Sequence, residues 1–301
     1  MRLKLLRNSS DWLPLNKIPE LLRDSVTGFI EDRAMYMGAA LAYYTILALV
    51  PMTFLLLAVF GAFMGKDEIG IIIQELFKSN IGLTDSVLIV DMVEQMQWSG
   101  TGFLAKLFGI VALLTVSSAF VVYFKHSINE LFGIRKKFET RKKKFLNEIL
   151  FRLISMGIVG GIAVVVISFY FIQAFVISSL DQVLIGNSAV EFYALQFFKH
   201  LLSIGMNLCI FMLIFKYLHD GYVRWKLAFF GALITSILLY IGQLLINYYL
   251  LHFFFAAKSG GVAGLLFIIL AYVYYSSQIL FFGAKLIAVY AIKIGKPIKV
   301  V

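Results

Sequence analysis

A long uncharged stretch near the start of the chain is MYMGAALAYYTILALVPMTFLLLAVFGAFM, which covers residues 35–64. The hydrocarbon core of a bilayer is about 30 Å thick, and a helix of about 20 apolar residues crosses it. The stretch exceeds that length, and a helix that is apolar on all sides belongs in lipid or in a large protein core. The sequence therefore predicts a transmembrane helix here.

The composition of the whole chain favours the same class of protein. Of the 301 residues, 61% are hydrophobic and 15% are charged, and the mean hydropathy is +0.89. Soluble domains are about 45–50% apolar and about 25% charged. The single cysteine, Cys209, lies in an apolar stretch, so disulfides indicate no compartment. The basic N-terminus lacks the continuous apolar core of a cleaved signal peptide, so we expect the first span to be retained.

Five further stretches meet or approach the length of a membrane span. They cover residues 107–124, 153–180, 201–215, 227–257 and 259–284, and the fourth span is expected to extend back past His200. Their length and lack of charge favour helices over barrel strands, which have about 9–11 residues with alternating polarity. We predict an all-α polytopic membrane protein with six transmembrane helices, forming a single integral membrane domain over residues 1–301.

Lysine and arginine alternate between the predicted loops and so indicate the orientation. The N-terminal segment, the loops after the second and fourth spans, and the C-terminus are basic, whereas the loop at residues 181–191 has no Lys or Arg. Basic loops remain cytoplasmic, so both termini are predicted to be inside. Two flanking segments are amphipathic: residues 1–34, expected as a helix on the cytoplasmic surface, and residues 66–102, expected outside.

The most basic loop contains IRKKFETRKKK, residues 134–144, with seven positive side chains. We interpret it as a determinant of topology that also contacts anionic lipid headgroups, with Arg135, Lys136 and Lys137 as the headgroup-attracting residues. Nucleic acid is disfavoured as a partner because recognition of single strands adds stacking aromatics, and only Phe138 interrupts the charge. A protein partner or an anionic substrate headgroup stays open.

No catalytic, metal-binding or cofactor-binding motif is found. The four histidines share no metal-ligand spacing and fall at opposite predicted membrane faces. The glycines of KSGGVAG, residues 258–264, are not in the order of a phosphate-binding loop. We therefore expect no enzyme activity, no metal and no cofactor.

Polar residues inside the predicted spans carry more information, because burying them in lipid is costly unless they find partners. Tyr43 and Tyr44 precede Pro51, whose missing N–H frees a carbonyl, so this segment is either a packed kink or a cavity wall. Tyr274 and Gln278 lie in a tyrosine-rich part of the sixth span. Gln243 shares a helix face with Asn247, either as a contact between helices or as a lining residue. Lys285 is expected to extend toward the membrane surface.

Four motifs resemble the YihY/BrkB family of bacterial inner-membrane proteins. They are LAYYTILALVP (residues 41–51), INELFG (residues 128–133), WKLAFFGALITSILLYIGQLLINYYL (residues 225–250) and YVYYSSQILFFGAK (residues 272–285). The resemblance implies six spans and an inner-membrane location, and it links members to movement of lipids. The family usually has Glu where Lys285 stands. Its older label, a tRNA-processing ribonuclease, does not fit a chain without a catalytic cluster.

Two functions follow as hypotheses. The first is a transporter, flippase or conduit for a lipid or other anionic amphiphile, with a path lined or shaped by Tyr43, Tyr44, Pro51, Asn129, Gln243, Tyr274 and Gln278. The second is a non-transporting envelope scaffold that binds a partner protein, with residues 66–102 as the contact surface. Membrane lipids are the expected partners in either case, and the oligomeric state stays open at this level.

Overall fold

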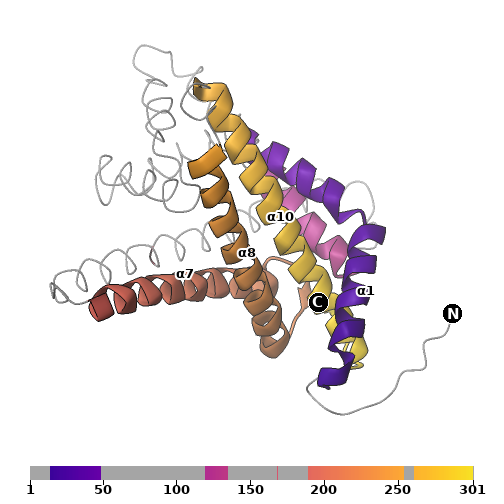
Figure 1. Ribbon diagram of the computed structural model, residues 1–301. Helices are drawn as coiled ribbons and strands as arrows, with labels where there is room; N and C mark the ends of the chain where they lie inside the picture. Colours follow the sequence, from indigo (N-terminus) through magenta and orange to yellow (C-terminus); the bar gives the residue numbers. More distant parts are fainter. Residues whose placement is uncertain (1–13, 49–118, 135–167, 169–188, 254–260, 301) are drawn as a thin grey trace, which may run out of the picture. The chain divides into compact units, whose positions relative to one another are not determined.

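The computed structural model describes residues 14–48, 119–134, 168, 189–253 and 261–300 (Figure 1). In this part of the chain almost every element is a helix, which agrees with the predicted all-α class. The elements are η1 (Leu15–Lys17), α1 (Ile18–Glu31), α7 (Ala189–Tyr217), β1 (Gly221–Tyr222), α8 (Trp225–Phe253), α10 (Gly261–Lys293) and β2 (Lys299–Val300). Helices also occupy Ala34–Ala48 and residues 119–131.

Three of these helices contain segments long and apolar enough to cross a membrane. The segments are His200–Tyr217 in α7, Trp225–Ile246 in α8 and Phe267–Lys293 in α10, of 18, 22 and 27 residues. They correspond to the predicted fourth, fifth and sixth spans. The helix that contains the predicted fourth span extends back past His200, since α7 begins at Ala189, and the candidate span begins at His200. The helix that contains the predicted sixth span continues beyond Ala284, since α10 ends at Lys293.

The chain divides into two compact units. The first comprises residues 1–34, 125–240 and 279–301, and the second comprises residues 35–124 and 241–278. Both α8 and α10 contribute residues to each unit. The predicted external segment, residues 66–102, and the predicted first three spans beyond Ala48 lie largely outside the described residues.

In the first unit, α10 packs against α8 at two glycines, one on each helix. A Cβ added to Gly283 would lie 1.9 Å from Thr235 Oγ1, and a Cβ added to Gly231 would lie 2.2 Å from Ile287 Cγ1. Glycine at these two positions therefore lets the two helix backbones approach closely, as small residues do between membrane helices. Around this contact Phe215, Phe281 and Leu286 are fully buried.

On its other side in the first unit, α10 binds α1 through ion pairs. Lys285 Nζ lies 2.6 Å from Asp32 Oδ2, and Lys293 Nζ lies 2.7 Å from Asp24 Oδ2. Gly28 leaves room for Lys285, since its Cβ would lie 2.3 Å from Lys285 Cε. Lys285, expected to extend toward the membrane surface, thus pairs with α1, and α1 packs on the protein through Leu21, Ser25 and Gly28.

The two short strands form a sheet that the sequence did not predict. β1 and β2 pair antiparallel, with Gly221 opposite Val300 and Tyr222 opposite Lys299. The chain reaches β2 through a turn at Gly295, whose φ of 70° suits glycine, after the helix ends with Lys296 N–H bonded to Ala291 O at 2.9 Å. The sheet connects the C-terminal residues to the turn between α7 and α8.

Candidate functional site

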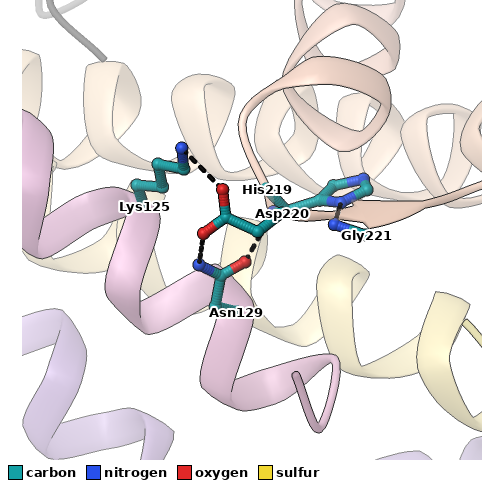
Figure 2. Close-up of polar contacts among 5 residues, drawn as sticks. All are labelled: Lys125, Asn129, His219, Asp220 and Gly221. Atoms are coloured by element: carbon teal, nitrogen blue, oxygen red, sulfur yellow. Dashed lines mark hydrogen bonds and ion pairs between the residues drawn. The ribbon is translucent and has the colours of Figure 1, made fainter. Parts of the chain in front are cut away.

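A cluster of polar side chains lies where helix 119–131 meets the turn between α7 and α8, and Asp220 is at its centre (Figure 2). One carboxylate oxygen of Asp220 pairs with Lys125 Nζ at 2.9 Å, and the other accepts a hydrogen bond from Asn129 Nδ2 at 2.8 Å. The backbone N–H of Asp220 donates to Asn129 Oδ1 at 2.9 Å. We refer to Lys125, Asn129, His219, Asp220 and Gly221 as the Asp220 cluster.

Three members of the cluster are buried, namely Lys125, Asn129 and His219, whereas Asp220 and Gly221 are half-buried. Lys125 is 4% exposed and Asn129 is 7% exposed. A buried ammonium group is costly unless an opposite charge and hydrogen bonds compensate it, and Asp220 supplies the carboxylate. Lys125 and Asn129 are four residues apart, so they share a helix face and reach the same acceptor.

The end of helix 119–131 fixes the position of Asn129. Gly133 has a φ of 72°, the Gly133 N–H donates to Glu130 O at 2.9 Å, and the Ile134 N–H donates to Asn129 O at 2.8 Å. This is a Schellman motif, which requires a left-handed residue and is usually built on glycine. The INELFG motif thus combines the polar Asn129 with a glycine that ends the helix just after it.

His219 completes the cluster in its neutral form. Its Nδ1 accepts a hydrogen bond from the Gly221 N–H at 3.0 Å, and its Nε2 lies 2.8 Å from Phe215 O. Since Nδ1 is the acceptor, the proton is assigned to Nε2, which donates to the carbonyl. Burial lowers the pKa of His219, and this effect exceeds the opposing influences of the Phe215 carbonyl and of Asp220.

The second unit contains most of the residues predicted to line a path. Gln243 Nε2 on α8 donates to Tyr272 Oη on α10 at 3.0 Å, and Gln243 is 7% exposed. Gln278 Nε2 donates to Met35 O at 3.3 Å, while its Oε1 is buried without a hydrogen-bond partner among the described residues. The amide groups of Gln243 and Gln278 are therefore polar groups on helices composed mainly of apolar residues.

Aromatic rings also meet in the second unit, on helix Ala34–Ala48 and at Tyr123. The Tyr44 ring lies 5.9 Å from the Tyr43 ring and 5.0 Å from the Tyr123 ring, between centroids. Tyr43 is 59% exposed and Tyr44 is half-buried. Tyr274 is also half-buried and lies on the α10 segment of the same unit.

The predicted path residues therefore divide in three ways. Five of them belong to the second unit, namely Tyr43, Tyr44, Gln243, Tyr274 and Gln278, whereas Asn129 belongs to the first unit and binds Asp220. The other residues named from the sequence lie outside the described part of the chain: Pro51, Arg135, Lys136 and Lys137. Their roles stay predictions.

Lys125, His219 and Asp220 were not predicted from the sequence as a cluster. The charge pattern does indicate that Asp220 has a partner, because it is an acidic residue near the basic residues Lys216, Arg224 and Lys226. An acidic side chain in a basic loop has oppositely charged neighbours available, but its partner Asn129 is distant in sequence. Among the described residues, no group of three or more His, Cys, Asp or Glu side chains is placed to hold a metal ion.

Comparison with known proteins agrees with the motifs and the apolar helices. The chain matches the family model described as "Virulence factor BrkB" over residues 25–299. It is 25% identical over 269 residues to a UPF0761 membrane protein of Pseudoalteromonas translucida (strain TAC 125), and the alignment covers 86% of this chain and 82% of that protein. No solved structure matches the chain. The chain belongs to the BrkB family of membrane proteins.

Proposed function

We propose that this protein is a six-span inner-membrane conduit for a lipid or other anionic amphiphile, with both termini in the cytoplasm. The alternation of basic and non-basic loops supports this orientation. The apolar segments of α7, α8 and α10 support three of the spans. In this proposal the protein moves its substrate without catalysing a reaction.

The observation that carries the proposal is the set of polar side chains in the second unit. Gln243 and Tyr272 bond to each other from two candidate spans, and Gln278 Oε1 is buried without a partner among the described residues. Inside a membrane, such groups mark either contacts between helices or a path for a polar group. A headgroup could exchange hydrogen bonds with these side chains while its acyl chains remain in lipid.

Reconstitution into liposomes with a labelled anionic phospholipid tests the proposal. We expect the wild-type chain to accelerate movement of the label between leaflets, and Gln243→Leu to slow it, because the headgroup loses a hydrogen-bonding partner. Leu245→Ala is the matched control, since Leu245 lies two residues further along α8 and is 65% exposed. Transbilayer rates equal to those of empty liposomes, or equal losses in both variants, would contradict the proposal.

A further inference from the structure

Two exposed aromatic side chains lie beside Lys216 where α7 ends and α8 begins, and a third, Tyr217, contacts one of them. Tyr217, Tyr222 and Trp225 are 51%, 59% and 48% exposed. Lys216 Nζ lies 4.3 Å from the centroid of the Tyr222 ring and 5.2 Å from that of the Trp225 ring. We refer to Lys216, Tyr217, Tyr222 and Trp225 as the Lys216 platform.

The platform is fixed by contacts of its own. Lys216 Nζ donates to Val223 O at 2.6 Å, and the Tyr217 and Trp225 rings meet edge to face with centroids 6.0 Å apart. Tyr222 belongs to β1 and pairs with Lys299 of β2. The turn between the two halves of the platform contains Asp220, which is bound to Asn129. The charge and the rings are therefore positioned before any ligand arrives.

An exposed apolar row leads away from the platform along α8. Trp225, Phe229 and Ile237 lie on one i, i+4 row of the helix and are 48%, 45% and 42% exposed. Rows of this spacing form continuous ridges on a helix surface. The same helix contains the candidate span Trp225–Ile246. A cationic, aromatic end and an adjoining apolar row together match the two ends of an amphiphile.

We propose that the Lys216 platform binds the phosphate of an anionic phospholipid, with an acyl chain lying along the Trp225–Phe229–Ile237 row. An ammonium group attracts the phosphate, and Trp and Tyr side chains are suited to the depth of the headgroups because one end is apolar and the other polar. A zwitterionic lipid lacks the net negative charge that Lys216 complements. The site lies in the first unit, and it rests on α8 spanning the membrane but not on transport through the second unit.

Lipid binding to the purified full-length chain tests this inference. We expect native mass spectrometry to show tighter binding of phosphatidylglycerol than of phosphatidylcholine. Lys216→Gln should weaken phosphatidylglycerol binding about fivefold, the usual effect of one basic residue near an anionic lipid surface. Lys216→Arg should restore binding, because it keeps both the charge and the contact with the rings.

The control Lys17→Gln removes the same charge from η1, and Tyr36→Leu removes an aromatic side chain of the second unit that is 77% exposed. If Lys17→Gln weakened phosphatidylglycerol binding as much as Lys216→Gln, net charge alone would explain the effect and the site would be overturned. Tyr222→Leu covers the case in which Lys216→Gln unfolds the protein, because an exposed ring can be lost without damage to the core. Unchanged phosphatidylglycerol binding by Tyr222→Leu would also overturn it.

Two further experiments test the apolar row separately from the Lys216 platform, and the lipid site separately from the proposed conduit. Glycerophosphoglycerol, which has the headgroup but no acyl chains, should bind more weakly than the whole lipid, and equal binding would overturn the role of the apolar row. Leaflet exchange measured on Gln243→Leu reports on the second unit instead. Loss of exchange with lipid binding intact would therefore leave this inference standing, and the reverse result would leave the proposed conduit standing.

Discussion

At the scale of single residues, Asp220 connects segments that are far apart in the sequence. Its carboxylate pairs with Lys125 and Asn129, and its backbone N–H binds the same Asn129 side chain. Because the Asn129 amide donates one hydrogen bond to Asp220 and accepts another from it, the two bonds together fix the position of Asp220. Asn129 was predicted from the sequence as a path residue, whereas the structure shows it as a partner of the turn between α7 and α8.

We predict that Asp220→Asn lowers the free energy of unfolding by about 3 kcal/mol, because it removes the carboxylate charge that pairs with the buried Lys125 ammonium group. Unfolding of the purified protein in mixed detergent micelles measures the effect. Adding Lys125→Met to Asp220→Asn should recover much of the loss, since the buried charge is then gone. A double variant as unstable as the single variant would contradict this explanation.

His219 gives a pH dependence with a defined sign. Burial lowers its pKa below the ordinary value of 6.5, so the unfolded chain binds a proton more readily than the folded chain does. The contribution of His219 to stability is therefore full above about pH 6.5 and falls as the pH drops below that value. Protonation of Nδ1 would also end its hydrogen bond with the Gly221 N–H.

We expect the Tm of the wild-type chain to fall between pH 7 and pH 5, and His219→Gln to flatten this slope while lowering Tm at pH 7. Thermal unfolding across that range measures both quantities. His126→Gln is the control, since His126 lies on the same helix as Asn129 but is exposed. A slope that disappears in the control variant instead would assign the effect to another histidine.

At the scale of elements, the helices could be predicted because their apolar length is encoded locally. α7, α8 and α10 follow from stretches without charge, and α1 follows from the amphipathic pattern of residues 1–34. The contacts between elements could not be predicted, since Lys285 meets Asp32 across 253 positions and Asn129 meets Asp220 across 91. No local pattern encodes such pairs, and β1 and β2 are too short for alternating polarity to be visible.

The packing of α8 on α10 predicts a steric effect at Gly283. Gly283→Ala should destabilise the protein by about 1–3 kcal/mol, because its Cβ would overlap Thr235 Oγ1 and crowd Phe215. Gly205→Ala in α7 is the matched control, since no described atom lies within 4 Å of its Cβ. Thermal unfolding should show no loss for Gly205→Ala, because alanine favours a helix more than glycine does, and similar losses in both variants would contradict the steric explanation.

At the scale of the whole molecule, the proposed topology rests on the distribution of Lys and Arg. The first and second units each contain parts of α8 and α10, so neither unit is a separate stretch of sequence. That residues 1–301 form a single integral membrane domain stays a prediction. The spans predicted at residues 107–124 and 153–180 fall largely on residues that the structure does not describe.

Cysteine labelling tests the proposed orientation. In a Cys209→Ser background, the Arg141→Cys variant should react with a membrane-impermeant maleimide only after the membrane is permeabilised. A cysteine at Asn187 should react in intact spheroplasts, because its loop has no Lys or Arg. Labelling of Arg141→Cys from outside would refute the six-span orientation.

The pairing of β2 with β1 has a practical consequence for anyone who handles this protein. Because Lys299 lies opposite Tyr222, a purification tag or fluorescent protein inserted at Lys299 would disrupt the strand pairing beside the Lys216 platform. Such a fusion should compete with the strand for space and alter lipid retention during extraction. Placing the fusion away from β1 and β2, on a long flexible linker, avoids that interference.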